Sequence, residues 1–424
     1  NITEKNDRYP RLCVYWISYI DDTCQNEIKQ DKTMSNEREF DVVIFGATGF
    51  TGKLVAEYFQ AQYGNDSSVK WAVAGRNEAK LTDVKQELGI SDSVASIVAD
   101  GDDADALDAM TKRTAVVLTT VGPYQIYGEK LLSACVDNGT GYTDLCGEPA
   151  WMHQMINKYE AKAKETGANI VFSCGFDSVP FDLGVHYLQA HAKKQTGDVI
   201  EYVKGRVRKM QGTFSGGTAA SLKATMAAAH KDKSVMAALI NPHSLTDGAS
   251  NQPQPDGNKP YFDEQLGTWV APFIMAAINT KNVHRTNYLG GYAYGKNFQY
   301  DEMMMTGPGE KGEAMANHVA KDKSLASDDG PKPGEGPSKE ERENGFYDVM
   351  FVGTATNGDM LAVSVKGDKD PGYGSTSKMI SESALCLCKD VNLSGGFFTP
   401  AAALGDKLIS RLEEKAGLTF AIER

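Results

Sequence analysis

The stretch DVVIFGATGFTGKLVAEYF, residues 41–59, decides the fold expected for this chain. Residues 42–45 form a continuous β-prone run without polar alternation, which is typical of a parallel strand covered on both faces. After three glycines, apolar residues recur at helical spacing as far as Phe59. The stretch therefore predicts a strand, a tight glycine turn and a helix.

The three glycines, Gly46, Gly49 and Gly52, follow the spacing G-x-x-G-x-x-G. Glycines at such a turn let the backbone approach a pyrophosphate at the N-terminus of the helix. A Walker-type triphosphate loop is excluded, because the positions it requires as Gly and as Ser or Thr hold Ala47 and Leu54. The remaining alternative is a turn that binds nothing. We expect a dinucleotide to bind here, through the following residues: Gly46, Ala47, Thr48, Gly49, Phe50, Thr51 and Gly52.

The second strand indicates which dinucleotide is bound. Strands of this kind end in an acid where NAD is bound, whereas NADP needs a cation for its 2′-phosphate. Here the strand closes with Gly75, Arg76 and Asn77, and Lys80 follows one helical turn later. The sequence thus favours NADP over NAD, with Arg76 and Asn77 at the cofactor. The alternative is that Arg76 is an ordinary surface charge.

Two later strand ends are expected to face the same crevice, because the carboxyl ends of parallel strands share one edge of the sheet. Asp100 ends the third strand and either hydrogen-bonds adenine or caps a helix. Val121, Gly122 and Pro123 end the fourth strand. We expect these three residues beside the nicotinamide or the inner phosphates.

With NADPH bound at this crevice, the expected reaction is hydride transfer to or from a substrate carbon. The protein must then also exchange a proton with the substrate, and the candidate proton donors are Tyr124 and Asp177. Both follow predicted strands that open onto the crevice. The alternatives are that Tyr124 stacks on the nicotinamide and that Asp177 caps the helix beginning near Pro180. The Tyr-x-x-x-Lys pair of short-chain dehydrogenases is missing from the expected helix, since only Tyr292 and Lys296 have this spacing and they lie far along the chain.

Strand and helix patterns alternate up to about residue 180, which predicts an α/β fold with an N-terminal Rossmann, doubly wound parallel sheet. Beyond it we expect a second α+β domain that contains an antiparallel sheet, with a hairpin turning at Asn357-Gly358. The expected organisation is as follows: an extension over 1–38, with natural translation starting at Met34, a Rossmann domain over 39–180, a substrate or dimerisation domain over 181–395 with mobile loops 244–260 and 306–345, and a segment 396–424 that returns to the Rossmann domain.

The composition of the chain argues against several classes of binding partner. The net charge of −12 argues against nucleic acid. The seven cysteines show no zinc-ligand spacing and are expected to be reduced thiols of an intracellular protein, and we expect no metal site. The apolar segment WVAPFIMAAI, residues 269–278, is too short to span a membrane. It is expected to be a buried helix or a pocket wall, and the alternative is a patch that contacts membranes or lipid droplets.

Several motifs together resemble one family, the saccharopine dehydrogenase-like oxidoreductases, which include the trans-acting enoyl reductases of bacterial lipid synthesis. The similar stretches run in the family's order from about Phe40 to the C-terminus. They are GATGFTGKLVAEYF, WAVAGRNEAKL, TTVGPYQIYGEKLLSACVDNGTGYTDLCGE, SCGFDSVPFDLG, FSGGTAAS, WVAPFIMAAIN and GGFFTPAAALG.

The resemblance implies an NADP-dependent oxidoreductase that transfers hydride to a lipid-linked or otherwise hydrophobic enoyl or keto substrate. One alternative is amino-acid chemistry of the saccharopine reductase type, which needs cations such as Arg206, Arg208 and Arg285 to converge on carboxylates. Another is a nucleotide-binding interaction protein on lipid droplets with little turnover. The family also leaves a homodimer and a cytoplasmic, mitochondrial, lipid-droplet or other membrane-associated location open.

Overall fold

The first of two sheets is parallel and carries the glycine turn. The computed structural model describes residues 38–213, 216–248, 252–322 and 335–424. Seven strands follow the order β13-β6-β5-β4-β1-β2-β3, which reverses direction between β1 and β4. Their bounds are Phe40–Phe45 (β1), Trp71–Gly75 (β2), Ala95–Val98 (β3), Thr114–Thr119 (β4), Gly141–Thr143 (β5), Asn169–Val171 (β6) and Gly396–Phe398 (β13).

Helices cover both faces of this sheet. Val42 and Ile44 of β1 pack into one hydrophobic core, whereas Val43 and Phe45 pack into another on the opposite face. This explains why residues 42–45 of the strand are all apolar, and it confirms the predicted doubly wound Rossmann arrangement. The helices are Phe50–Tyr63 (α2), Glu78–Glu87 (α3), Ala104–Lys112 (α4), Tyr124–Tyr127 (α5), Glu129–Asp137 (α6) and Pro149–Thr166 (α7).

The second sheet also has seven strands, in the order β14-β12-β11-β7-β10-β9-β8. Its neighbours pair antiparallel except for β7 and β10, so the predicted second sheet is confirmed as mostly antiparallel. The predicted hairpin is the pair β11 and β12. The strands are Tyr202–Gln211 (β7), Tyr261–Asp263 (β8), Thr268–Pro272 (β9), Gln299–Gly307 (β10), Phe346–Thr354 (β11), Met360–Gly367 (β12) and Leu418–Ile422 (β14).

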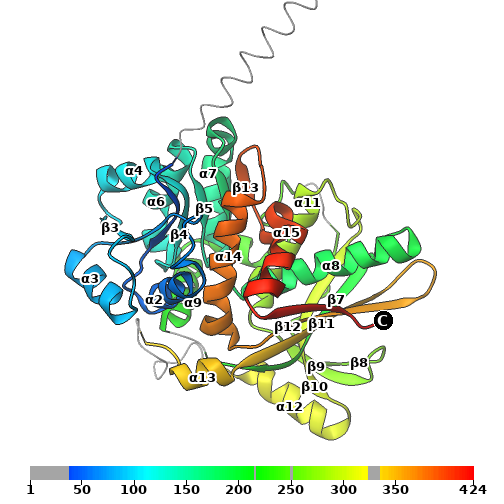
Figure 1. Ribbon diagram of the computed structural model, residues 1–424. Coiled ribbons are helices and arrows are strands. Elements are labelled where there is room, and N and C mark those ends of the chain that lie inside the picture. The colour runs from blue at the N-terminus through cyan, green and yellow to red at the C-terminus, as the bar shows by residue number, and fades with distance from the viewer. Residues whose placement is uncertain (1–37, 214–215, 249–251, 323–334) are drawn as a thin grey trace, which may run out of the picture. The chain divides into compact units, whose positions relative to one another are not determined.

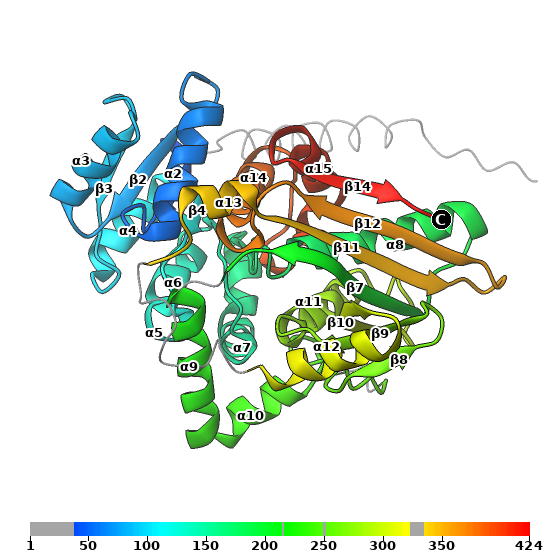
Figure 2. The ribbon, with the colours of Figure 1, turned by 90° about the horizontal axis from the view of Figure 1, so that it is seen from below.

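The remaining helices join and flank the two sheets. Helix α14 packs against α2, β4 and α15, so it lies between the first sheet and α15 (Figure 1). Helix α9 leads into α10, which packs against α7 (Figure 2). These helices are Val179–Thr196 (α8), Gly216–Lys231 (α9), Lys233–Ile240 (α10), Ala276–Leu289 (α11), Gly309–Lys321 (α12), Lys339–Asn344 (α13), Thr376–Lys389 (α14) and Pro400–Lys415 (α15), with a short π-helix at Pro371–Ser375.

Three segments differ from the expectation. Residues 269–272, expected as part of a buried helix or a pocket wall, belong to strand β9, because they pair with the antiparallel strand β10, where Val270 and Ala271 are fully buried. The expected loop 306–345 contains α12 and α13, and its residues 323–334 lie outside the described part. Residues 396–424 contribute β13 to the first sheet but β14 to the second. Residues 1–37, including Met34, also lie outside the described part, and the domain boundaries stay a prediction.

In the described ranges, no helix combines the length and the apolar character needed to cross a bilayer.

Candidate functional site

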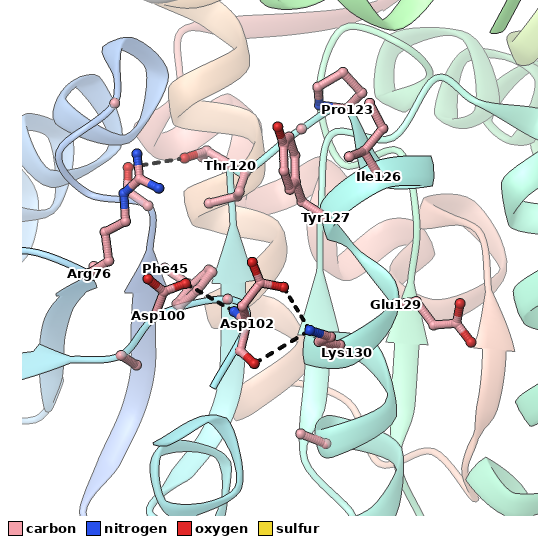
Figure 3. Close-up of a pocket in the computed structure, with 18 of the residues that line it drawn as sticks. Phe45, Arg76, Asp100, Asp102, Thr120, Pro123, Ile126, Tyr127, Glu129 and Lys130 are labelled. Atoms are coloured by element: carbon pink, nitrogen blue, oxygen red, sulfur yellow. Dashed lines mark hydrogen bonds and ion pairs between the residues drawn. The ribbon is translucent and has the colours of Figure 1, made fainter. Parts of the chain in front are cut away.

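A cavity of about 1320 Å³ lies where the first sheet reverses its strand order, at the carboxyl ends of β1, β2, β3 and β4. In open α/β sheets this is the place where ligands bind. Figure 3 shows Arg76 on one side of the pocket and Pro123, Ile126 and Tyr127 on the other.

The glycine turn forms the floor of this pocket. Gly46 has φ +91°, and a Cβ there would lie 2.6 Å from Val121 Cγ2. A Cβ on Gly52 would lie 2.0 Å from the Gly46 carbonyl oxygen, so this glycine lets helix α2 pack on the turn. At Gly49 a Cβ would meet only that same oxygen, at 3.4 Å. The protein's own packing therefore does not demand glycine at position 49, whereas the close approach of a ligand would.

Helix α2 begins at Phe50 without protection from any side chain. Its N-cap residue Gly49 offers no side-chain hydrogen bond, and its first turn holds no acid. The backbone N–H groups of such a turn and the helix dipole attract an anion. Because the glycine cradle and the helix N-terminus face one cavity, the residues present fit a dinucleotide pyrophosphate.

Arg76 lies on one side of the pocket, directly after β2 (Figure 3). Its side chain is exposed, and no carboxylate within the described ranges pairs with it. Asn77 caps helix α3, because its side chain accepts a hydrogen bond from Lys80 N at 3.0 Å. Arg76 is thus the cation that β2 presents to the cavity.

The acids after β3 form a second wall. Asp100 lines the pocket and accepts a hydrogen bond from Asp102 N at 3.0 Å, while the helix cap of α4 is Asp103. Asp102 pairs with Lys130 at 2.6 Å, and hydrogen bonding to Lys130 lowers the pKa of Asp102 (Figure 3). Asp100 therefore remains available to a ligand in the pocket and does not cap the helix.

An apolar patch lies on the side of the pocket opposite Arg76 (Figure 3). Ile126 and Tyr127, which are 59% and 54% exposed, line it next to Pro123. Ala220 and Ala224, one turn apart on α9, line it as well. Exposed apolar side chains gathered at a cavity mark a binding surface for apolar groups.

Tyr124 lies inside the protein, although its neighbours Pro123 and Ile126 line the cavity. The side chain is 5% exposed, its hydroxyl donates to Thr119 O at 3.3 Å, and it accepts from Leu145 N at 3.0 Å. Burial raises the pKa of Tyr124 well above its ordinary value. This position disfavours both predicted roles, proton donation and stacking on the nicotinamide, because the ring belongs to the core that contains Trp151.

Asp177 follows β6 at the same edge of the sheet, but it lies beyond the pocket lining. Its carboxylate accepts no hydrogen bond from the described residues, and helix α8 has no side-chain cap, so the alternative of a helix cap is wrong. Burial raises the pKa of Asp177 to about 7. Asp177 can therefore carry a proton at neutral pH.

The structure brings most of the predicted cofactor residues together. The residues that line the cavity are Gly46, Thr48, Gly49, Phe50, Thr51, Arg76, Asp100, Val121, Gly122 and Pro123. Ala47 and Gly52 lie beneath it in the turn, and Asn77 faces its helix. Sequence reasoning missed Ile126 and Tyr127, although two large apolar residues so soon after a strand end were a usable signal.

The arginines proposed for amino-acid chemistry do not converge. Arg206 is fully buried and pairs with Asp263 at 3.2 Å and Asp301 at 3.1 Å. Arg208 pairs with an acid of β11 and with Glu423, directly after β14, and Arg285 pairs with an acid of α7. Because each guanidinium already has a carboxylate partner, the three residues do not form a site for substrate carboxylates.

The described ranges offer little support for a metal site or for a nucleophilic cysteine. No group of three or more His, Cys, Asp or Glu side chains there is placed to hold a metal ion. Cys146 and Cys174 are free, fully buried thiols, and burial raises the pKa of both well above the ordinary value. Their surroundings disfavour the thiolate that a nucleophile requires.

Comparison with known proteins assigns the chain to a family. The model of the saccharopine dehydrogenase NADP-binding domain matches residues 42–171. A Mycobacterium tuberculosis protein provisionally named a trans-acting enoyl reductase is 40% identical over 403 residues, which cover 88% of this chain and 96% of the relative. A trans-acting enoyl reductase of Mycobacterium ulcerans is 35% identical over 411 residues, which cover 90% and 97%.

Solved structures share the fold at low sequence identity. The saccharopine dehydrogenase (L-Glu forming) of Saccharomyces cerevisiae matches with a TM-score of 0.51 at 12% identity, over 90% of this chain and 99% of that one. The homospermidine synthase of Legionella pneumophila, solved with NAD, matches with a TM-score of 0.53 at 8% identity, over 90% and 91%. These likenesses concern the arrangement of the two sheets.

Proposed function

The chain belongs to the saccharopine dehydrogenase-like oxidoreductases, together with the trans-acting enoyl reductases, and from this premise we propose that it uses NADPH to reduce a hydrophobic enoyl or keto substrate. Family membership makes it a nicotinamide-dependent oxidoreductase that acts on a small-molecule substrate. The proposal of NADPH and a hydrophobic substrate rests on one observation: the glycine turn, Arg76 and an apolar wall line the same cavity.

The preference for NADPH rests on Arg76. This side chain lies in the pocket after β2, where the ribose 2′ position is read in sheets of this kind. A guanidinium without a carboxylate partner in the described ranges can bind a phosphate with two hydrogen bonds. An acid, which would accept the 2′-hydroxyl of NAD, is missing from the end of β2.

The preference for a hydrophobic substrate rests on the apolar side of the cavity. Ile126 and Tyr127 face the pocket together with Ala220 and Ala224 of α9. Small residues on the helix leave room for a chain of methylene groups between the two elements. The bound cofactor supplies the hydride, and the protein holds the substrate, excludes water and provides a proton. The names of the mycobacterial relatives support reduction of a carbon–carbon double bond.

Two other functions are less well supported. The amino-acid alternative needs a cluster of available cations, and Arg206, Arg208 and Arg285 are all paired with acids of the protein itself. A dinucleotide-binding interaction protein with little turnover would share the same cofactor site. Turnover separates it from the reductase.

The test begins with calorimetric titration of the purified protein with NADPH and NADH, and continues with cofactor oxidation on a substrate panel. The panel holds trans-2-enoyl and 3-keto thioesters of short and long chain length, with saccharopine formation assayed in parallel. We expect NADPH to bind at least about tenfold more tightly than NADH, and oxidation to rise with chain length. Retained NADPH without turnover across the panel would support the interaction protein instead.

A matched pair of variants tests the apolar wall. Ile126→Ser should raise the KM for the long-chain thioester by about tenfold, because burying an Ile side chain is worth roughly 1.5–3 kcal/mol. Met315→Ser removes another large side chain that is about half exposed, on α12 outside the cavity, and should leave KM unchanged. Equal KM values for wild type and Ile126→Ser would exclude the wall as an acyl site.

A further inference from the structure

Helix α9 contributes to the apolar wall of the cavity but has little apolar packing of its own. Three of its 16 residues are buried, namely Gly216, Ala219 and Ala229, and the helix packs mainly against α10. Apolar burial therefore contributes less to the position of α9 than to that of the helices that cover the first sheet. Polar contacts have a correspondingly larger share in deciding where α9 lies.

Two neighbouring rows of side chains run along α9. Ala220 and Ala224 line the cavity, and the residue after each of them, Ser221 and Thr225, hydrogen-bonds to a side chain outside the helix. Residues four apart on a helix lie on the same side, so each pair forms a short row. One row therefore faces the cavity, and the other attaches the helix to the rest of the protein.

Glu148, between β5 and α7, accepts the hydrogen bond from Ser221. Its side chain is 2% exposed, and Oε1 accepts from Ser221 Oγ at 2.9 Å and from Tyr124 N at 2.9 Å. The other oxygen, Oε2, accepts from Gln125 N at 2.8 Å. One buried carboxylate thus joins α9 to the start of α5, and its three donors offset the cost of burying the charge.

The start of α5 depends on this carboxylate. The N-cap residue Pro123 provides no side-chain hydrogen bond, and the first N–H groups of a helix have no partner within the helix. Glu148 supplies the acceptor for two of them and places a negative charge where the helix dipole favours one. Ile126 and Tyr127, the large apolar residues of the wall, follow directly in the same helix. Glu148 therefore fixes the half of the wall that α5 contributes.

A second contact joins the same two helices. Gln125 Nε2 donates to Thr225 Oγ1 at 3.0 Å, and Figure 2 shows α9 beside α5. The two attachment points, Ser221 and Thr225, are one helical turn apart and run alongside Ala220 and Ala224. Attachment at two points fixes both the distance of α9 from α5 and its rotation about its own axis. The space between the alanines and the apolar side chains of α5 is therefore set before a ligand binds.

We propose that Glu148 is a positioning residue for the substrate, which joins α5 to α9 and so sets the width of a slot that holds the acyl chain. The inference rests on the proposed function, which supplies the acyl substrate. The glycine turn and Arg76 follow β1 and β2 and make none of these contacts. Loosening α9 from α5 should therefore weaken the binding of long acyl chains more than that of short chains or of NADPH.

The first experiment separates the two helices without changing Glu148. Ser221→Ala and Thr225→Val, combined in one protein, remove both contacts and leave the start of α5 intact. The KM for a long-chain trans-2-enoyl thioester should rise about three- to tenfold, whereas the KM for a short-chain thioester and the Kd for NADPH should stay within about twofold. Ser221→Thr keeps a hydroxyl donor and should behave like wild type. An unchanged KM for the long chain in the double variant would overturn the proposal.

Two matched variants control for the loss of a helix hydroxyl. Ser410→Ala on α15 and Thr82→Val on α3 each remove an exposed hydroxyl that donates to a carbonyl of its own helix, that of Asp406 and that of Glu78. Both variants should keep the wild-type KM for both chain lengths. A rise in either control as large as that in the double variant would contradict the assignment to the contacts between α5 and α9.

Glu148→Gln changes the shared acceptor itself. It replaces one carboxylate oxygen with an NH₂ group, which cannot accept from the donors that Glu148 holds. The KM for the long chain should rise at least as much as in the double variant, and the melting temperature should fall. A folded Glu148→Gln protein with the wild-type KM for the long chain would remove the positioning role from Glu148.

Hydrogen–deuterium exchange tests the attachment without turnover. In the double variant the amides of α9 should exchange at least about fivefold faster than in wild type, while those of α7 keep their rate. Equal exchange of α9 in both proteins would overturn the attachment. If wild-type protein oxidises NADPH with no member of the panel, the proposed function and the acyl slot fail together. If wild type prefers long chains and the double variant keeps the same preference, only this inference fails.

Discussion

The carbonyl oxygen of Gly46 lies only 2.0 Å from the position that a Cβ of Gly52 would occupy. The same oxygen is 3.4 Å from the position of a Cβ on Gly49, a distance that neighbouring atoms can accommodate. Two glycines of one turn thus have different reasons to be glycine. Gly52 permits the helix to pack on the strand end, and Gly49 leaves the space above the turn open.

Alanine at each position should separate these two reasons. Gly52→Ala should lower the free energy of unfolding by about 1–3 kcal/mol, because the added methyl group cannot be accommodated without moving the backbone. Gly49→Ala should change that free energy by less than about 1 kcal/mol but weaken NADPH binding at least about tenfold, since the methyl group would occupy space needed by a phosphate. Urea denaturation and calorimetry measure the two effects. Normal NADPH affinity in Gly49→Ala would contradict the assignment of the cradle.

Charge reversal at Arg76 tests the choice of cofactor. Arg76→Glu should raise the Kd for NADPH by about 10–100-fold, which corresponds to roughly 1.5–3 kcal/mol for a hydrogen bond to a charged group, and should leave NADH within about threefold. Lys80→Glu is the control, because Lys80 is exposed on α3, the helix that follows Arg76, and does not line the pocket. Equal losses for both cofactors would remove Arg76 from the 2′-phosphate.

Removal of the Tyr124 hydroxyl should affect folding and not chemistry. Tyr124→Phe leaves the partly buried N–H of Leu145 without its acceptor, which should cost about 1–3 kcal/mol of unfolding free energy. The turnover of the folded protein should stay the same. Tyr127→Phe, at the exposed pocket wall, should leave stability unchanged in the same denaturation experiment. A large fall in kcat for Tyr124→Phe would restore this residue as the proton donor.

We expect Lys281 to make the free energy of unfolding depend on pH in the alkaline range. Lys281 is 3% exposed, and its ammonium group donates hydrogen bonds to Leu239 O and Ala277 O. It has no acid partner in the described ranges. Burial lowers the pKa of Lys281 from 10.5 to about 8. The unfolded chain then holds the proton more tightly between pH 8 and 10.5, so the contribution of Lys281 to stability rises with pH across this window.

The measurement is the free energy of unfolding at several pH values from 8 to 10 in wild type and Lys281→Met. Wild type should gain up to about 1.4 kcal/mol per pH unit relative to the variant. Lys339→Met, which removes an exposed lysine of α13, should run parallel to wild type. A constant difference between wild type and Lys281→Met would show that Lys281 does not titrate in this range.

Local patterns were sufficient for the first sheet and for much of its site. The apolar run before Gly46, the glycine spacing and Arg76 after β2 each act over a few residues, so the sequence predicts them directly. The buried position of Tyr124 was not predicted, for a related reason. A strand end predicts which loop faces the crevice but not which side chain of a helical turn points inward, and here Tyr127 faces the cavity and Tyr124 faces the core.

Long-range pairing was beyond the reach of such patterns. Asn279 is 101 residues from Ser178 in the chain, and only the packing of α11 brings its side chain to the loop after β6. The run of apolar residues over 269–278 predicts burial but does not distinguish a strand from a helix, and the antiparallel partner β10 decided the outcome for residues 268–272. Which sheet each part of residues 396–424 joins likewise depends on strands far upstream in the chain.

The last strands have a consequence for biosynthesis. The edge of the first sheet at β6 is covered only when Gly396–Phe398 arrives, and the second sheet gains β14 later still. Phe397 is fully buried, and its carbonyl accepts a hydrogen bond from Arg285. A nascent chain released or stalled before this point would therefore present an unpaired strand to its surroundings, and we expect such fragments to need chaperones rather than fold vectorially on the ribosome.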